Sequence, residues 1–342
     1  MNCLLLNPED ERWLDFASSN SQANIFHHPA WQHLLSSCYG YAPFVLVVHD
    51  DTGEICAGLP LMEINSWVTG RRWVSLPFTD YCAPLSRDDE SLTCLTNWII
   101  NAYQDKQAPR IELRWEFPQN EMILRSSDMV VHTIELNADP DLVAKGLKRT
   151  HRQNIRTAEK RGVRVERGDQ IEHLRMYYEL QLETRRRHGV PAQPWRFFKC
   201  LAHSLFEPGL GFVLLAYKDD ECLAGIVFLH WQKTITAKYA ASRTDSWKLR
   251  PNNLLFWSGI QWGCENGYTM FDFGRTEKTD SGLRRYKKGW GAVERPLVYS
   301  MLSENQPQGT NAKMENIMQN VIRKSPPIVC QVAGELLYKH FA

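Results

Sequence analysis

The sequence has almost no net charge and no long apolar run. Its 40 Lys and Arg residues against 39 Asp and Glu give a formal charge of +1, so the whole chain has no general attraction to nucleic acid or anionic lipid. No stretch reaches the roughly 18 apolar residues of a membrane span. The first ten residues also lack the basic start of a secretory signal. These absences predict a cytoplasmic protein.

Motifs that mark several common enzyme classes are also missing. The nine cysteines are scattered without a Cys-x-x-Cys pair, which argues against a zinc ribbon or a redox pair, and free buried thiols in a reducing cytosol are the expectation. There is no Gly-x-Ser-x-Gly and no Walker loop. The histidines do not have metal-ligand spacing. We therefore expect no metal site and no tightly bound cofactor.

Two segments of the chain resemble each other. Residues 44–61 and 212–229 each consist of two apolar, β-branched runs around a polar turn, the pattern of a β-hairpin. Each copy carries Ala-Gly in its second strand, at Ala57-Gly58 and Ala224-Gly225. A glycine there indicates a bulge or a close approach of other atoms to the backbone. Chance similarity between short apolar strands is the alternative.

The elements predicted after each hairpin follow the same order of strand, helix, strand and strand. After the first hairpin they occupy residues 72–77, 89–105, 110–116 and 129–136, and after the second 234–242, 251–266, 269–273 and 296–302. A chain of 342 residues is longer than most single domains. The repetition therefore predicts two α/β (α+β) domains of one architecture, 1–138 and 139–304.

A helix predicted over residues 140–162 joins the two halves, because an Asp-Pro pair opens it and a glycine ends it. Between residues 145 and 164 the one acidic residue is Glu159, so ion pairs within the helix cannot neutralise its basic face. A solvated surface and a site for a phosphate-rich ligand are both open. The cations on that face are Lys145, Arg149, Arg152, Arg156 and Lys160.

Residues 305–342 are predicted to form a polar linker and C-terminal helices. The linker occupies 305–310, and the helices occupy 313–323 and 329–341. Apolar residues gather on one side of the last helix. Docking of this helix on the body is one reading, and peripheral contact with a membrane surface is the other.

The pattern that points most directly to chemistry lies between residues 267 and 291. Asp272 stands on a short strand between two phenylalanines, where a carboxylate is unfavourable to bury unless it is paired. A structural ion pair and a site that holds a substrate amine are both compatible with this position. The cations that follow it are Arg275, Arg284, Arg285, Lys287 and Lys288.

A short aromatic and basic segment follows at residues 286–291, with the sequence Tyr-Lys-Lys-Gly-Trp-Gly. Its glycines allow the backbone to approach a ligand closely. A lysine ammonium in this segment can stabilise the oxyanion that forms when an amine attacks an ester or thioester carbonyl.

Several stretches resemble the FemAB-type transferases. Phe-Asp-Phe-Gly-Arg-Thr at 271–276 and the segments 286–291 and 296–299 are similar to the C-terminal signature of that family. Residues 148–163 resemble the basic helix that opens its second domain. Parts of the N-terminal half resemble a FemAB-related branch found with exosortase and exopolysaccharide loci. These parts are residues 28–31, 58–61 and 74–81.

The resemblance implies tandem acetyltransferase (GNAT)-like domains with mixed, mostly antiparallel sheets. It implies that Lys287 stabilises the reacting carbonyl, and Asp272 is the second catalytic candidate. Arg114 shares one face of a strand with Glu112, so it either pairs with that residue or reaches the cleft. The substrate-binding candidates are Tyr286, Arg275, Arg284, Asp80, Tyr81 and Arg114.

The donor side departs from the acetyl-CoA enzymes of this fold. Those enzymes usually carry a glycine-rich loop whose N–H groups cradle the pyrophosphate, whereas residues 242–253 contain no glycine. Phosphate contacts would then come from side chains, Lys248 among them. Peptidoglycan members of the family take an aminoacyl group from tRNA, which would give the basic helix a purpose. The donor-binding candidates are Asn253, Arg250, Lys148, Arg149, Arg152 and Arg156.

The sequence thus predicts a transferase that moves an acyl or aminoacyl group to an amine of a peptidoglycan or exopolysaccharide precursor. The donor is aminoacyl-tRNA or acyl-CoA, and DNA is not an expected partner. The first alternative is an acetyl-CoA-dependent N-acetyltransferase of a small amine. The second is a non-catalytic ligand-binding protein with the same fold, and the third is a nucleic-acid binder whose affinity falls steeply with salt.

Overall fold

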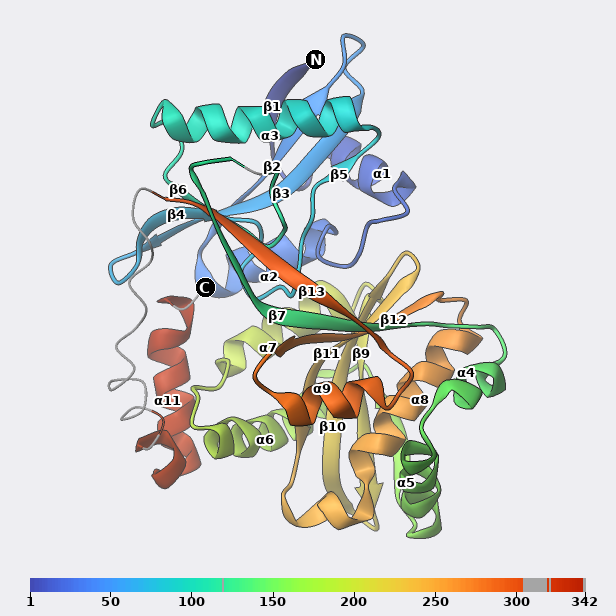
Figure 1. Cartoon of the computed structure of the whole chain (residues 1–342). Coiled ribbons are helices and arrows are strands. Elements are labelled where there is room, and N and C mark those ends of the chain that lie inside the picture. The colour runs from blue at the N-terminus through green and yellow to red at the C-terminus, as the bar shows by residue number, and fades with distance from the viewer. Residues whose placement is uncertain (119, 304–318, 320, 341–342) are drawn as a thin grey trace.

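The computed structural model describes residues 1–118, 120–303, 319 and 321–340, and one long sheet runs through it (Figure 1). The helices and strands of the N-terminal half are β1 (Asn2–Leu6), α1 (Glu11–Ser19), α2 (Pro29–Tyr39), β2 (Ala42–His49), β3 (Ile55–Ser66), β4 (Gly70–Val74), β5 (Leu85–Ser86), α3 (Asp89–Gln104), β6 (Arg110–Leu113) and β7 (Ile123–Glu135).

The second half follows with a similar alternation of strands and helices. Its elements are α4 (Pro140–Gly146), α5 (Arg149–Lys160), β8 (Arg164–Gly168), α6 (Ile171–His188), α7 (Trp195–Leu201), the π-helical η1 (Ala202–Phe206), β9 (Gly211–Lys218), β10 (Glu221–Trp231), β11 (Thr234–Ser242), the 3-10 turn η2 (Asp245–Leu249), α8 (Pro251–Glu265), β12 (Met270–Glu277), α9 (Ser281–Lys288) and β13 (Val293–Leu302). Among the described residues, no helix is long and apolar enough to cross a bilayer.

Two long strands link the halves at the centre of the sheet. The strand order is β1-β2-β3-β4-β6-β13-β7-β12-β11-β10-β9-β8, and β5 pairs with β3. β13 runs antiparallel to β7 and reaches β6 through its last three residues, while β7 pairs on its other side with β12. Figure 1 shows β7 and β13 crossing the middle of the molecule. The sheet is therefore continuous from one half to the other.

The predicted repetition is present in the structure. Each half has an antiparallel hairpin, β2–β3 and β9–β10. Each also has one parallel pair, β4–β6 and β11–β12, and these two are the parallel pairs among the described strands. The prediction of two GNAT-like halves with mixed, mostly antiparallel pairing is confirmed. The boundaries at residues 138 and 304 stay a prediction.

The repeated glycines mark close packing against the second strand of each hairpin. A Cβ on Gly58 would lie 2.6 Å from Cζ3 of Trp13, a side chain that is fully buried. A Cβ on Gly225 would lie 2.8 Å from Leu215 and 2.9 Å from the ring of Tyr177. Both distances are too short for real contacts, so a residue without a side chain is required at each position.

One hydrophobic core joins the halves. It contains Trp31 and Leu61 from the first half and Tyr177, Phe197 and Leu215 from the second. A second core lies on the opposite face of the sheet in the second half, beneath α5 and α8, because successive residues of β10 point to opposite faces. This division fixes α5 and α8 on the same side of β11 and β12.

The single helix predicted over 140–162 is wrong, because two helices, α4 and α5, occupy that segment. Between them Leu147 is extended and buries its side chain in the second core. The N–H of Lys148 donates to the carbonyl of Gly289 at 2.8 Å instead of continuing the helix. The guanidinium of Arg152 donates to the carbonyls of Ala144 and Leu147 and so caps α4. The buried face of α5 consists of His151, Ile155 and Ala158.

The C-terminal part ends in α11 (Pro327–Leu337) and the 3-10 turn η3 (Tyr338–His340). The predicted linker 305–310 and most of the predicted helix 313–323 lie outside the described residues. α11 packs beside α6, where the thiol of Cys330 contacts the carbonyl of Val190 at 3.3 Å (Figure 1). The helix is therefore docked on the body, as the first reading predicted.

Candidate functional site

The two parallel pairs of the sheet differ in what fills the gap beyond them. β4 and β6 separate after Val74, and the segment that follows Val74 closes the gap between them. The N–H of Ser75 donates to the backbone carbonyl of Glu112, and the N–H of Arg114 donates to the Ser75 hydroxyl. β11 and β12 pair only over Thr234–Thr236 and Met270–Asp272. Beyond them the gap stays open, which places the candidate site in the second half.

A cavity of about 220 Å³ lies in this open gap. The strands β11 and β12 form two of its walls, and the segment between β4 and β5 forms the third. Its lining combines one carboxylate, two cations and several aromatic rings. The lining residues are Phe78, Asp80, Ala237, Lys238, Tyr239, Phe273, Gly274 and Arg275.

Asp80 is the acidic group of the cavity wall. Its carboxylate lies 3.4 Å from Nζ of Lys238 and 3.6 Å from Nε of Arg275. Its backbone carbonyl accepts a 2.5 Å hydrogen bond from the hydroxyl of Tyr299 on β13. The segment before it is strained, because Phe78 has a φ of 61°, and such backbone persists only where surrounding contacts enforce it. These contacts fix the Asp80 side chain as a hydrogen-bond acceptor facing the cavity.

Lys238 was not among the residues singled out by sequence reasoning. Its side chain is buried, and Nζ lies 4.9 Å from the ring centre of Phe26, 5.7 Å from Trp31 and 5.5 Å from Tyr239. Burial lowers the pKa of Lys238, while Asp80 acts in the opposite direction. A lysine in the middle of an otherwise apolar strand is the signal that could have identified it.

Asp272 and Lys287 lie behind the cavity wall and hold Gly274 from two sides. The N–H of Gly274 donates to the Asp272 carboxylate at 2.7 Å, and Nζ of Lys287 donates to the carbonyls of Gly274 and Arg275 at 2.8 and 3.1 Å. Gly274 has a φ of 70°, and a Cβ there would approach the Asp80 carboxylate to 3.2 Å. The two catalytic candidates thus shape the wall opposite Asp80.

Burial perturbs both of these buried groups. Desolvation, reinforced by the nearby charge of Asp80, raises the pKa of Asp272 from 3.8 to about 7. Desolvation also lowers the pKa of Lys287 from 10.5 to about 8, against the opposing effect of Asp80 and Asp272. These shifts bring the pKa values of Asp272 and Lys287 close to neutral pH from opposite directions, a pattern that is common among functional residues.

The remaining substrate-binding candidates divide between the cavity and other places. Arg275 lines the cavity and its side chain is 41 % exposed. Tyr81 follows Asp80, and burial raises its pKa. Arg114 lies 4.0 Å from Glu112, as the first alternative predicted, and its guanidinium lies over the ring of Tyr299 at 5.0 Å; Arg114 is not among the residues that line the cavity. Through Tyr299 it supports the backbone of Asp80.

Tyr286 and Arg284 are outside the cavity lining. The ring of Tyr286 packs against His151, with centroids 4.9 Å apart, beside the second core. Arg284 forms a two-pronged ion pair with Glu294 at 2.8 and 2.9 Å on the outer side of α9. The structure gives both residues packing or pairing contacts, and their substrate-binding role stays a prediction.

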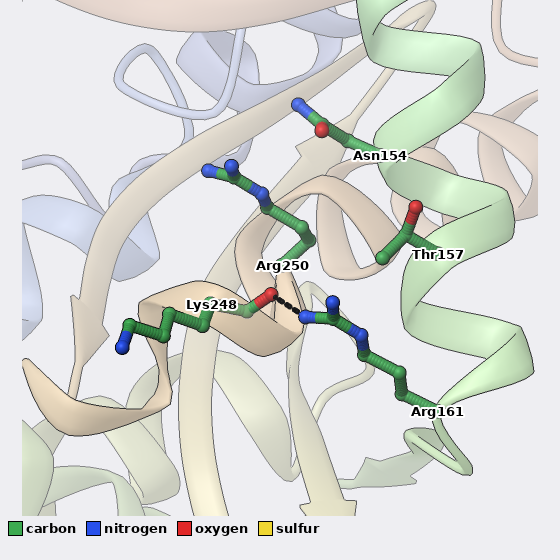
Figure 2. Close-up of a pocket in the computed structure, with 5 residues that line it drawn as sticks. All are labelled: Asn154, Thr157, Arg161, Lys248 and Arg250. Atoms are coloured by element: carbon green, nitrogen blue, oxygen red, sulfur yellow. Dashed lines mark hydrogen bonds between the residues drawn. The ribbon is translucent and has the colours of Figure 1, made fainter.

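A second and larger cavity of about 350 Å³ lies where α5 approaches η2 and the start of α8. Figure 2 shows residues on and just after α5 facing the segment that carries Lys248 and Arg250. The guanidinium of Arg161 donates to the backbone carbonyl of Lys248. No acidic residue contributes to the lining, which consists of Asn154, Thr157, Arg161, Lys248 and Arg250.

Of the donor-binding candidates, Arg250 lines this basic cavity, whereas the others do not. Asn253 is buried, and its amide pairs with Nδ1 of His151 at 2.8 Å, which ties α8 to α5. Arg152 caps α4. The other three are exposed on or beside α5; they are Lys148, Arg149 and Arg156. Arg161 was not among the candidates from the sequence, because it lies outside the helix face that carries Lys145, Arg149, Arg152, Arg156 and Lys160.

Comparison with known proteins agrees with this architecture. Residues 145–288 match the family model of the acetyltransferase (GNAT) domain. No curated protein matches the sequence. Among solved structures, FemX superposes with a TM-score of 0.69 at 15 % identity, over 93 % of this chain and 100 % of that chain.

Two further structures share the fold. One is the C-terminal domain of a protein described as a lysylphosphatidylglycerol synthetase from Agrobacterium fabrum, with a TM-score of 0.56, 16 % identity and coverage of 91 % of this chain and 95 % of that one. The other is a tandem GNAT protein from the clavulanic acid biosynthesis pathway, with a TM-score of 0.54, 10 % identity and coverage of 89 % and 100 %. The FemAB-type, GNAT-like fold implied by the sequence is confirmed.

Proposed function

We propose that this chain is a cytoplasmic acyltransferase that moves an acyl or aminoacyl group from an activated donor to an amine of a peptidoglycan or exopolysaccharide precursor. The observation that carries the proposal is Asp80, held between Lys238 and Arg275 in the open gap of the GNAT-like half. The likeness to FemX and to a lysylphosphatidylglycerol synthetase favours an aminoacyl group and a cell-wall or lipid precursor. The nine free thiols fit a reducing compartment.

The acceptor amine is proposed to bind at Asp80. An arriving ammonium pairs with this carboxylate and passes one proton to it, which leaves a neutral, nucleophilic amine. Asp272 lies behind the wall with a pKa raised to about 7 by burial and by the charge of Asp80, so Asp272 is proposed to change its charge near neutral pH and thereby to influence how readily Asp80 takes the proton. Arg275, which is partly exposed at the cavity wall, is suited to a carboxylate or phosphate of the acceptor.

The new amide forms when the amine nitrogen attacks the acyl carbonyl. A C–N bond forms, and the C–O bond to tRNA or the C–S bond to CoA breaks. The nitrogen loses a second proton, which leaves with the oxygen or sulfur, and the first proton passes from Asp80 to the solvent. Positive charge from Lys238, and from the part of the cavity wall that Lys287 holds in place, stabilises the oxyanion. Nζ of Lys287 uses two of its three hydrogens on Gly274 and Arg275, so Lys287 is proposed to act mainly by positioning the wall.

The donor's phosphates are proposed to bind in the basic cavity beside α5. Three cations and no carboxylate line it, a composition suited to phosphate oxygens. The exposed cations of α5 extend the basic surface toward a larger, nucleic-acid-like donor. Acetyl-CoA remains the second candidate donor, because the matched family model is that of the acetyltransferase (GNAT) domain.

Removing the two guanidinium groups of this cavity, Arg161→Ala with Arg250→Asn, is expected to raise the donor KM about tenfold or more, because charge-assisted hydrogen bonds are each worth about 1.5–3 kcal/mol. The side chain of Lys248 extends away from the cavity (Figure 2), and asparagine tolerates the left-handed backbone of position 250. kcat should change little, since the reacting atoms lie at the other cavity. Initial rates against donor concentration, with acyl-CoA and aminoacyl-tRNA in parallel, measure both constants. A donor KM that rises steeply with salt identifies the tRNA donor.

The matched control is Lys145→Ala with Lys160→Ala, which removes the same charge from exposed positions outside the cavity. Its donor KM should stay within about twofold of the wild-type value, because exposed charges contribute little individually. Equal donor KM values for the two double variants would contradict the assignment of the basic cavity.

A further inference from the structure

The surface around α11 carries an unusual share of exposed apolar side chains. Of the fourteen large apolar residues that are exposed among the described residues, five lie on α11 or in the turn between β3 and β4. Trp67 is 85 % exposed, and Ile328 and Leu336 are each 64 % exposed. Exposed apolar patches of this kind mark interaction sites. We define the α11 surface by its residues Trp67, Ile328, Val332 and Leu336.

These residues form a continuous ridge. Ile328, Val332 and Leu336 are spaced by four positions and therefore lie on one face of α11. Four positions further on, His340 stacks against Trp67 with ring centres 5.4 Å apart, and the indole N–H donates to Nε2 of His340 at 3.2 Å. The indole thus extends the aliphatic stripe at the end where the helix finishes.

The apolar side chains of the ridge are not exposed because α11 fails to pack on the core. The opposite face of α11 is already packed, because Cys330 is fully buried and a Cβ on Gly334 would meet the carbonyl of Ala192. The carboxylate of Glu335, the acidic group of α11, accepts a hydrogen bond from the N–H of Trp195 at 3.2 Å. The outward face of α11 thus has exposed apolar side chains with respect to the described residues, while the opposite face is packed on the body.

Cations flank the ridge in the sequence. Arg323 and Lys324 precede α11, Lys339 follows Leu336 within one turn, and all three are exposed; the guanidinium of Arg323 also donates to the carbonyl of His188 at 3.3 Å. Within the described residues 321–340, Glu335 is the one acidic residue against these three cations. An apolar stripe with an indole at one end and cations at its edges is the composition of helices that lie in the headgroup layer of a membrane.

We propose that the α11 surface docks the protein on an anionic lipid bilayer. The stripe spans about 12 Å along the helix, and with Trp67 the α11 surface has four exposed apolar side chains, whereas each partner of a stable protein interface contributes about 20–30 residues. A ridge of this shape inserts into a deformable headgroup layer more readily than it fits a rigid protein surface. The cations at its edges match anionic lipid headgroups.

The packed face of α11 continues into the wall of the acceptor cavity. Tyr338, two residues beyond Leu336, packs against Phe78 with ring centres 4.9 Å apart, and Phe78 lines the cavity. Because helical residues two positions apart point to opposite sides, the α11 surface faces away from the cavity, and α11 lies between the cavity and a bilayer bound there. The docking itself does not depend on the proposed transfer reaction.

Vesicle sedimentation with the full chain tests the proposal. Wild-type protein is expected to sediment with phosphatidylcholine–phosphatidylglycerol vesicles, less with phosphatidylcholine alone, and less as salt rises. The triple variant Ile328→Ser, Val332→Ser and Leu336→Ser should lower the partition coefficient about tenfold or more, because three apolar side chains lose their contact with the acyl region. Trp67→Ala should weaken binding by a smaller factor.

The control variant Leu4→Ser, Leu5→Ser and Leu142→Ser removes the same number of exposed apolar side chains elsewhere and should bind like the wild type. Circular dichroism and melting curves establish that each variant is folded. Absence of wild-type binding to the anionic vesicles, or equal binding by the triple variant, would overturn the proposal. So would a concentration-dependent dimer that the triple variant abolishes in the absence of vesicle binding, since the ridge would then bind a second copy.

Discussion

Exchanging Asp80 for asparagine is expected to lower kcat by about 10²–10⁴-fold, the usual contribution of a positioned general base. The amide keeps the size of the side chain and its contact with Lys238 at the 3.4 Å position, but it cannot take a proton from an acceptor ammonium. Steady-state transfer rates at saturating donor measure the loss. The acceptor KM should also rise, because the ammonium loses its charged partner.

Asp89→Asn is the matched control for this variant. Asp89 undergoes the same chemical change, but it is exposed in the first turn of α3, away from the cavity. Its kcat should remain within about twofold of the wild-type value. An Asp80→Asn enzyme that turns over within about threefold of the wild type, and melts at the same temperature, would exclude Asp80 as the base.

Exchanging Lys238 for methionine is the second change with a large expected effect. The thioether fits among the rings of Phe26, Trp31 and Tyr239, where sulfur–aromatic contacts are favourable, so the fold should be kept. Asp80 then loses its buried cation, and positive charge disappears from the wall where the oxyanion forms. We expect kcat to fall by about 10²-fold or more, as for loss of an oxyanion-stabilising group.

The control for Lys238 is Lys233→Met in the turn before β11. Lys233 is exposed, and its hydrogen bonds to Thr269 and Met270 are made by its backbone carbonyl, which the exchange does not alter. Its transfer rate should therefore not change. Equal rates in the two methionine variants, measured on folded protein, would remove Lys238 from the mechanism.

Much of the fold follows from local patterns in the sequence. The two apolar runs of β9 and β10 and the polar turn between them predict a hairpin, and a glycine cap ends α6 at Gly189 in the left-handed conformation. The repetition of these patterns predicts the two halves. The position of β13 between β6 and β7 could not be predicted, because that pairing joins residues that are far apart in the chain.

The candidate site was predictable in part. Asp272 stands out as a carboxylate between two phenylalanines, and Lys287 lies in a recognisable motif, yet their shared contact with Gly274 depends on how α9 packs on β12. Lys238 gave only a weak signal, because its partner Asp80 is 158 positions away. Asn253 also has a partner far away in the sequence. Its side-chain amide, which was predicted to contact the donor, pairs with His151.

The pH dependence of kcat/KM for amine transfer, measured for the wild type and for Asp272→Asn, tests the central claim most directly. With the pKa of Asp272 near 7, the carboxylate pair should give the wild type an acid limb near that pH. Removing the second carboxylate should move the limb to lower pH. An acid limb that is absent from the wild type, or that stays at the same pH in Asp272→Asn, would contradict proton transfer by this pair.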